Sequence, residues 1–351
     1  RGSAASVAFN FAGADNLSLK DNGVLIFDLG TGDITSPGAS TNDITIGGIS
    51  GLIRFASAGA VGSGIAPLLT FVAALGQSTT SGAVYLENGA ALSITGTVTT
   101  SDQDLSITAL GAVDQSAGID AGAGTLTVKT LDAAGVDIVL DFAGNVARRI
   151  DLRALDAVGG TTNLGGDLEY VSAAGALSVL AVTTGNDTGS FSLTMPVDGT
   201  SYTIDQVGAT APILVGSTGT VSITANNHDI TFDNVGNDFG GEVRIVSGNN
   251  VNLQDANAFT FGNAGTSAIA GTLTLQTAGA ITQTPAVTVT GTTSITAGAN
   301  DITLDNGSND FGGEVRIVSG NTVNLQAANA FTFGNAGVSA IHRGLHIIRD
   351  N

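Results

Sequence analysis

Residues 222–269 read SITANNHDITFDNVGNDFGGEVRIVSGNNVNLQDANAFTFGNAGTSAI, and residues 294–341 read SITAGANDITLDNGSNDFGGEVRIVSGNTVNLQAANAFTFGNAGVSAI. The two stretches begin at Ser222 and Ser294, align without a gap and are identical at 39 of 48 positions. A period of this kind is the signature of a repeat architecture, in which each unit buries its apolar face only against its neighbours. The fold must therefore be one that grows by stacking copies of a short unit.

Apolar and polar residues alternate within the repeat. Residues 251–254 (VNLQ) and 273–276 (LTLQ) are examples, and Gly, Asn and Asp separate such runs. Alternation places one set of side chains inside and the other outside a strand. Gly, Asn and Asp supply the turns between strands. The sequence therefore predicts an all-β protein of short strands.

The length of the repeat selects among all-β architectures. Sandwich arrays repeat at about 100 residues and propeller blades at about 40–50. Roughly six or seven strand runs in one repeat fit three or four coils of about 18–24 residues each. We therefore predict a right-handed parallel β-helix (β-solenoid), with roughly 16 coils at a spacing of about 4.8 Å.

Equivalent residues of the two copies should then stack. Phe259 and Phe331 are expected in one interior column, a few coils apart, and Asn252 and Asn324 are candidates for a hydrogen-bonded ladder. The chain is divided at the repeat: 1–221 contains diverged coils, 222–341 contains the 72-residue repeat, and 342–351 is an off-pattern tail that is a terminus, a cap or an artefact.

Composition excludes several classes of protein. Hydrophobic residues make up 42% and charged residues 12%, the reverse of a disordered chain. A net charge of −19 disfavours nucleic acid as a partner. The absence of Cys excludes disulfides and thiolate metal sites. The longest apolar stretch, residues 65–75, is too short to span a bilayer, so no membrane insertion is expected.

Several motifs in the repeat resemble a known bacterial group. The segments 237–241 (NDFGG), 255–262 (DANAFTFG), 271–275 (GTLTL) and 279–283 (GAITQ) look like the repeats of filamentous-haemagglutinin-like giant bacterial adhesins or exoproteins. The close match covers about 222–341. The resemblance implies export across the bacterial outer membrane, an extracellular or cell-surface location, and a role in adhesion. The Asn-Pro-Asn motifs of that group's secretion domain do not occur here.

The expected function is that of a structural or adhesive rod that gives reach and display. Its partners would be a host or neighbouring-cell surface, or a second copy through end-to-end self-association. One alternative is a self-assembling subunit of a surface layer, sheath or extracellular filament. A second is a polysaccharide-acting β-helix enzyme, which would need carboxylates, basic residues or His clustered on one face.

No such catalytic cluster is visible, so the protein is not expected to be an enzyme. The chain has three His, and His228 becomes Asn300 in the second copy, which fits a surface turn. The run 148–153 (RRIDLR) is the single basic cluster, either a local anion or partner site or an ordinary surface strand.

Six acids of the repeat could supply oxygen ligands to calcium, the one cofactor considered. No EF-hand loop or calcium nonapeptide pattern accompanies them, so solvated turn acids are the alternative interpretation. The candidate ligands are Asp233, Asp238 and Glu242 in the first copy and Asp305, Asp310 and Glu314 in the second.

Overall fold

A computed structural model describes residues 9–10, 16–38, 42–160, 165–198, 200–207, 211–334 and 339–349. Regular secondary structure in these ranges is entirely β, and they contain no helix that could cross a membrane. The strands pair in parallel and stack as a β-solenoid of about 13 turns. The predicted all-β parallel solenoid is therefore confirmed.

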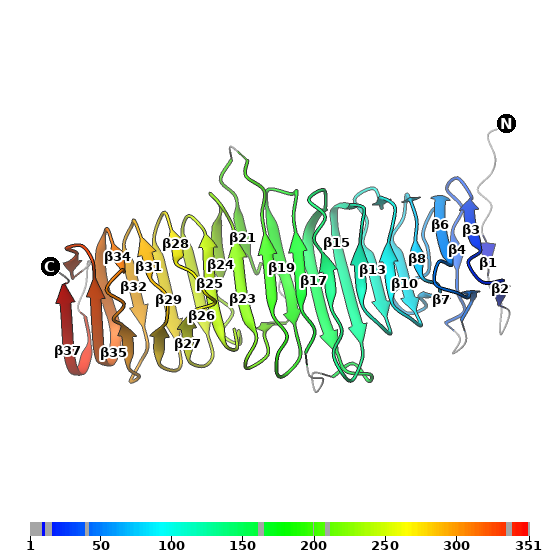
Figure 1. Ribbon diagram of the computed structural model, residues 1–351. Helices are drawn as coiled ribbons and strands as arrows, with labels where there is room; N and C mark the ends of the chain where they lie inside the picture. Colours follow the sequence, from blue (N-terminus) through cyan, green and yellow to red (C-terminus); the bar gives the residue numbers. More distant parts are fainter. Residues whose placement is uncertain are drawn as a thin grey trace. The chain divides into compact units, whose positions relative to one another are not determined.

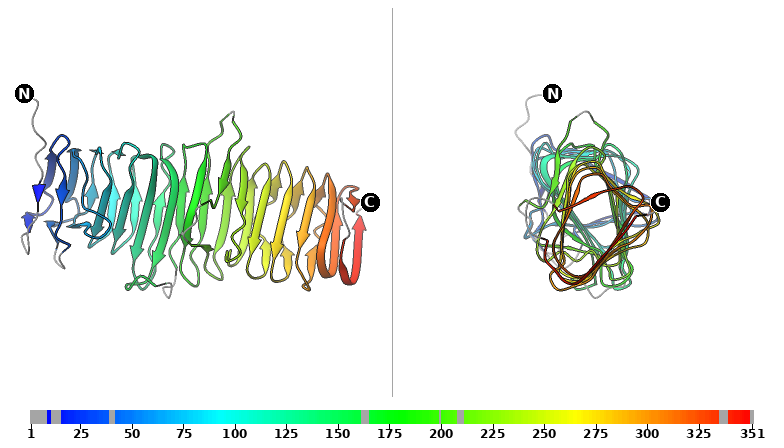
Figure 2. Two further views of the ribbon diagram at one scale, coloured as in Figure 1. Left: turned by 180° about the vertical axis from the view of Figure 1, so that it is seen from behind. Right: turned by 90° about the vertical axis from the view of Figure 1, so that its left-hand side faces the viewer.

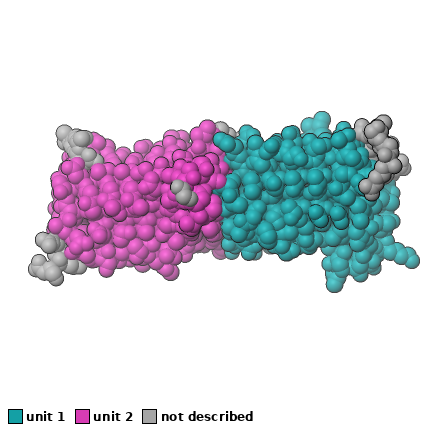
Figure 3. All heavy atoms as spheres, turned by 90° about the horizontal axis from the view of Figure 1, so that it is seen from above, with its two compact units in different colours: residues 1–174, 183–185 teal, residues 175–182, 186–351 magenta. Residues whose placement is uncertain are grey.

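The chain forms two compact units, coloured separately in Figure 3: unit 1 comprises residues 1–174 and 183–185, and unit 2 comprises 175–182 and 186–351. Within each unit the strands follow one another around successive coils (Figures 1 and 2). The first eighteen strands are β1 (Phe9–Asn10), β2 (Leu17–Leu19), β3 (Val24–Asp28), β4 (Ile34–Thr35), β5 (Ile44–Ile46), β6 (Leu52–Ser57), β7 (Leu68–Phe71), β8 (Ala74–Leu75), β9 (Ser78–Thr79), β10 (Val84–Asn88), β11 (Leu92–Ile94), β12 (Val98–Thr99), β13 (Leu105–Ala109), β14 (Val113–Gln115), β15 (Ile119–Leu131), β16 (Ile138–Leu140), β17 (Val146–Leu155) and β18 (Leu168–Val171).

The remaining strands continue the same arrangement. They are β19 (Leu177–Thr183), β20 (Phe191–Thr194), β21 (Thr203–Asp205), β22 (Ile213–Leu214), β23 (Thr220–Thr224), β24 (Asp229–Phe232), β25 (Glu242–Ser247), β26 (Val251–Asp255), β27 (Phe259–Phe261), β28 (Ser267–Ile269), β29 (Leu273–Thr277), β30 (Ile281–Gln283), β31 (Val287–Val289), β32 (Thr293–Thr296), β33 (Ile302–Leu304), β34 (Asp310–Phe311), β35 (Glu314–Ala327), β36 (Thr332–Phe333) and β37 (Ile341–Arg349).

Interior columns of apolar side chains hold the coils together. In unit 1, Val84, Leu105, Leu126 and Ile150 lie in register on β10, β13, β15 and β17. All four are essentially buried. Burying one such side chain contributes about 1.5–3 kcal/mol. The alternation in the sequence therefore produces the core directly.

The coils vary in length more than the sequence predicts. A short coil separates Leu68 from its partner Leu86, whereas a much longer one separates Leu177 from its partner Ile204. Most paired strands keep their register apart from local bulges, so most of the additional residues lie at the corners between strands. Longer coils explain why the structure has about 13 turns and not the predicted 16.

Unit 2 has three stacks of strands. The first stack contains β21, β24, β26, β29, β32 and the first half of β35. The second contains β20, β23, β25, β27, β30, β33 and the second half of β35. The third contains β28, β31 and β34. One coil therefore passes through three faces where all three stacks are present.

The 72-residue repeat does not return to the stack from which it starts. Three coils from Val251 pass through Leu273 and Thr293 and end at Val315, and all four residues lie in the first stack. The sequence equivalent of Val251 is not Val315 but Val323, which lies further along the chain, in the second stack. The repeat therefore advances the chain by three coils and one additional face.

The prediction that equivalent Phe residues share one column is consequently wrong. Phe261 pairs with Val243 in the second stack, whereas its equivalent Phe333 pairs with Val315 in the first. Local packing is nevertheless kept. The rings of Phe239 and Phe259 meet edge to face at 6.2 Å, and those of their equivalents, Phe311 and Phe331, do so at 5.8 Å. The copies preserve contacts between neighbours while changing face.

The off-pattern tail continues the solenoid. Residues 341–349 form β37, which pairs in parallel with the second half of β35 and places Leu345 beside Val323 and Ile347 beside Leu325. Residues 350–351 lie outside the described ranges. The described part of the tail is therefore a further coil strand, despite its different sequence.

Candidate functional site

One polar feature that recurs three times is a pair formed by a buried Asn and a Gln one coil earlier. Asn237 is fully buried, and its Oδ1 accepts hydrogen bonds from Gln206 Nε2 (3.0 Å) and from the Ile213 N–H (2.9 Å). Its Nδ2 donates to Gln206 Oε1 and to the Phe232 carbonyl. The two amides therefore connect adjacent coils at a corner, and we call the pair a corner clamp.

The corner clamp recurs twice with the same bonds to the Asn Oδ1, but one copy is incomplete. The return bond from Asn Nδ2 to Gln Oε1 is present in Gln283–Asn309 and absent in Gln115–Asn145, where Gln115 Oε1 is buried without a partner. The equivalent pairs are Gln115 with Asn145 and Gln283 with Asn309, in which the Asn accepts from the N–H of Ile119 and Val287 respectively. The clamping Asn residues end the segments 140–145 (LDFAGN), 232–237 (FDNVGN) and 304–309 (LDNGSN). In each segment, Asn Nδ2 donates to the carbonyl of the first residue.

Sequence reasoning missed the corner clamps. It selected Asn252 and Asn324, whose strand neighbours point inward, so that these two side chains face outward on different stacks. The available signal was the spacing of an apolar residue, Asp and a final Asn in the three segments. Segments 232–237 and 304–309 are equivalent in the two repeat copies, but their partners Gln206 and Gln283 are not, so the repeat alone does not reveal the pairing.

The acids proposed as calcium ligands do not come together. Asp233 and Asp305 are exposed on turns. Asp238 accepts from the Gly240 N–H and from Asn257 Nδ2, and the Glu242 carboxylate accepts from the Asn263 N–H. Among the described residues, no three His, Asp or Glu side chains form a metal-binding group.

The second-copy acids lie on other elements. Asp310 is half-buried in β34, and Glu314 is exposed at the start of β35. Calcium binding by either copy therefore stays a prediction of the sequence.

Many acids instead accept backbone hydrogen bonds across coils. Asp229 Oδ1 accepts from the Asn250 N–H (2.9 Å), and its equivalent Asp301 accepts from the Thr322 N–H (2.9 Å). Asp104 and Asp137 accept similarly from the next coil. The Thr322 N–H and Asn321 lower the pKa of Asp301, because they stabilise its carboxylate. These acidic side chains therefore help to hold neighbouring coils together at the corners.

Asp255 is one of several acids that lie in the interior. It ends β26 with 2% of its surface exposed. Burial raises its pKa to about 6 and the charge of Asp238 adds to this, although the N–H groups of Asn257 and Phe239 act in the opposite direction. The equivalent residue in the second copy is Ala327, which is fully buried.

His228 is not the surface residue that the sequence suggested. It is fully buried, its Nδ1 accepts from the Tyr202 N–H (3.1 Å), and its Nε2 lies 3.2 Å from the Pro196 carbonyl oxygen. This pattern requires the tautomer with the proton on Nε2. His228 therefore fixes a corner. In the second copy its equivalent Asn300 fixes the corner instead, because its Nδ2 donates to the Ala278 and Ala297 carbonyls.

The basic run 148–153 lies on β17. Arg153 forms a bidentate ion pair with Asp151, with Nη2 2.8 Å from Oδ2, and Arg149 donates to the Ala123 carbonyl. Two of the three arginines therefore have partners, one within the run and one on β15 of the preceding coil. The arrangement fits an ordinary surface strand better than an anion site.

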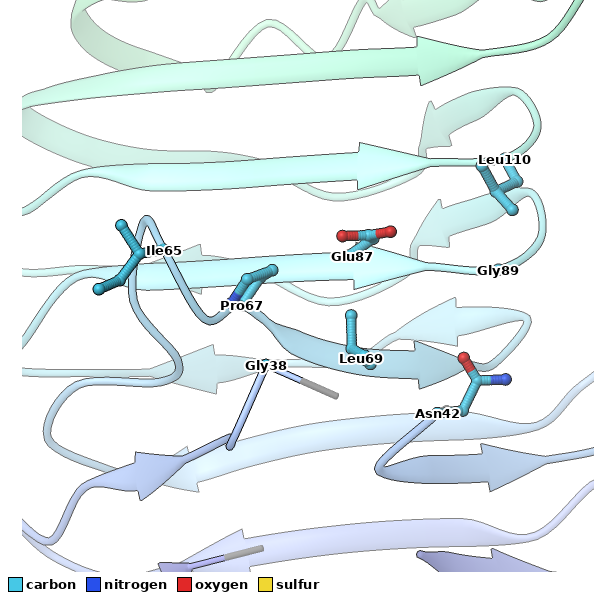
Figure 4. Close-up of a pocket in the computed structure, with 8 residues that line it drawn as sticks. All are labelled: Gly38, Asn42, Ile65, Pro67, Leu69, Glu87, Gly89 and Leu110. Atoms are coloured by element: carbon cyan, nitrogen blue, oxygen red, sulfur yellow. The ribbon is translucent and has the colours of Figure 1, made fainter. Parts of the chain in front are cut away.

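An outward groove in unit 1 has a volume of about 380 Å³ (Figure 4). It lies over β7, β10 and β13. Its lining is mixed: four side chains are apolar, Glu87 and Asn42 are polar, and the polar part of the exposed lining is the larger. The described residues that line it are Gly38, Asn42, Ile65, Pro67, Leu69, Glu87, Gly89 and Leu110.

These features define a repeat protein of the parallel β-solenoid class, with polar corners and an apolar interior. The chain belongs to the family described as repeats of unknown function (DUF5649), whose profile matches residues 81–150, 146–246 and 248–318. Each matched segment contains the Asn of one corner clamp. No curated protein and no solved structure gives a significant match.

Proposed function

We propose that this protein is a structural scaffold of a bacterial surface or secreted protein, which holds adhesive elements away from the surface. The haemagglutinin-like motifs of the repeat support this role and an extracellular location. The proposal assigns the chain no catalytic reaction. Most of the polar groups described above form contacts between coils, as expected of a scaffold.

The observation that carries the proposal is the change of face between repeat copies. A catalytic groove or a flat ligand-binding face requires its residues on one side of a solenoid. Here Asn252 and its equivalent Asn324 lie in different stacks, so near-identical outward surfaces point in different directions. A scaffold tolerates this change of face. Its core, its corners and its solubility do not depend on which face carries a given outward residue.

The test compares adhesion and catalysis on one set of variants. Beads coated with the chain are scored for attachment to bacterial and mammalian cells, and the free chain is scored for release of reducing ends from neutral and acidic polysaccharides. The variants replace outward residues of the first stack (Thr274→Ala, Ser294→Ala) or of the second (Thr282→Ala, Thr303→Ala).

A scaffold predicts no release of reducing ends, and attachment that neither set of substitutions abolishes. Turnover of any polysaccharide that is lost in one set alone would contradict the proposal.

A further inference from the structure

We propose that the outward groove of unit 1 binds a lysine or arginine side chain, flanked by apolar residues, in an extended segment of a partner protein. A scaffold does not require this site, so the two proposals are tested separately. The inference rests on a missing side chain in an apolar column and on the charge beside it.

The missing side chain is that of Gly89. β7, β10 and β13 pair in register through Thr70, Asn88 and Ala109. The next residue on each strand points outward, which aligns Phe71, Gly89 and Leu110. Gly89 has no side chain, so a gap lies between the side chains of Phe71 and Leu110. We call this gap the Gly89 notch. Its two walls are two strand spacings apart, about 9.6 Å.

The Gly89 notch is apolar and open to solvent. Phe71 is 41% exposed and Leu110 48% exposed, which is high for residues of this size. A Cβ added at Gly89 would lie 3.1 Å from Phe71 Cδ2, so the Phe71 ring leans over Gly89 and the notch opens on the side of Leu110. Exposed apolar groups gathered around a concave surface are typical of interaction sites. The aliphatic part of a partner side chain would lie over the Phe71 ring and against Leu110.

The charged residue of the groove is Glu87, which lies two residues before Gly89 in the chain. The outward column beside the notch is Leu69, Glu87 and Thr108, in register on the same three strands. Glu87 is the one charged residue among the described residues that line the groove. A side chain that lies in the notch and ends in a cation therefore meets a carboxylate. The net charge of −19 also attracts a basic partner over longer distances.

The walls favour a peptide over a sugar. Ile65 is 96% exposed at the tip of a tight turn, closed by bonds between Ser63 and Ala66. Pro67 extends this apolar wall (Figure 4). A sugar ring could use the polar part of the lining, but it would leave the apolar wall of Ile65 and Pro67 uncovered. Apolar residues on either side of a basic one match this surface.

The experiment is a titration observed at leucine methyl groups. The full chain, with isotopically labelled Leu methyls, is titrated at low salt with an acetylated hexapeptide of alternating lysine and leucine. The same peptide with every lysine side chain acetylated removes the charge and keeps the length. Glu87→Gln removes the carboxylate, Gly89→Ala fills the notch, and Glu169→Gln on β18 is the matched control.

We expect saturable shifts of the Leu69 and Leu110 methyls, with a dissociation constant on the order of 1 mM, as befits one partly exposed ion pair plus a small apolar contact. Glu87→Gln and lysine acetylation should each weaken binding several-fold, Gly89→Ala should weaken it without unfolding, and Glu169→Gln should leave it unchanged. Equal binding of the acetylated peptide, or of the Glu87→Gln variant, would overturn the proposal. Shifts caused by glucosamine oligomers but not by the peptide would instead assign the groove to an amino sugar.

Discussion

Replacing Asp255 by alanine should change how the stability of the protein depends on pH. Asp255 is buried at the end of β26, and its pKa in the folded protein is about 6, against 3.8 for an ordinary Asp. The folded state therefore binds a proton at a pH where the unfolded state does not. For this group, stability rises as the pH falls from about 7 to about 4, by about 2 kcal/mol.

The second copy of the repeat supplies the replacement residue. Ala327 is the equivalent of Asp255 and is buried in the same local setting, so Asp255→Ala is compatible with the backbone. At neutral pH the variant loses the acceptor for the Phe239 and Asn257 N–H groups but also loses a buried charge. These effects oppose each other, so the pH dependence is more informative than the stability at one pH.

The assay is urea unfolding followed by far-UV circular dichroism at neutral pH and at about pH 4. Other carboxylates titrate in both proteins, so the relevant quantity is the difference between wild type and variant at each pH. That difference should shift by about 2 kcal/mol in favour of wild type at the lower pH. Asp233→Ala, at an exposed position directly after β24, is the control for the substitution itself. A difference that is the same at both pH values would refute the reasoning.

Three further predictions follow from single side chains. Thr293 Oγ1 is buried without a partner, and the first copy has Val221 there, so Thr293→Val should stabilise the protein by about 1 kcal/mol in urea unfolding; a loss of stability would show that the hydroxyl is satisfied. Asn309→Ala removes a corner clamp and should cost about 2–3 kcal/mol, whereas outward Asn324→Ala should cost at most about 0.5 kcal/mol; equal costs would show that the clamp contributes nothing. Asn306 precedes Gly307 in a turn, so its side-chain amide should react with the Gly307 nitrogen, release ammonia and, after hydrolysis, gain about one dalton on storage in mildly alkaline buffer. Peptide mass spectrometry should find this change at Asn306 before its equivalent Asn234, which precedes the bulkier Val235, and the opposite order would contradict the assignment.

The sequence was sufficient for the class of fold but not for its cross-section. Alternation such as 273–276 determines which side chains are inside, and Leu273 and Leu275 are buried as predicted. The number of residues per coil depends on the corners, where insertions leave the alternation unchanged. The 72-residue repeat is compatible with three coils, with four, or with three coils and one additional face. Only the strand pairing of Val251 and Val323 selects the third option.

The polar sites were harder to predict for the same reason. The corner clamps bring together residues far apart in the sequence, such as Gln283 with Asn309, at separations that vary with coil length. Asp and Glu residues were visible in the sequence as possible ligands. Whether each accepts a backbone N–H or contributes to an ion site depends on which corner it occupies. The groove residues Leu69, Glu87 and Leu110 carry no motif at all.

The central claim is that the repeat advances by one face, and paired spin labels test it most directly. The chain has no Cys, so two labels can be attached without background. Asn252 and Arg316 are outward residues of the first stack, three coils apart, or about 14 Å. Labels at these positions should show dipolar broadening in a continuous-wave electron paramagnetic resonance spectrum. Labels at the sequence equivalents Asn252 and Asn324 should show none, because they lie on different stacks. Broadening for Asn252 with Asn324, and none for Asn252 with Arg316, would contradict the account.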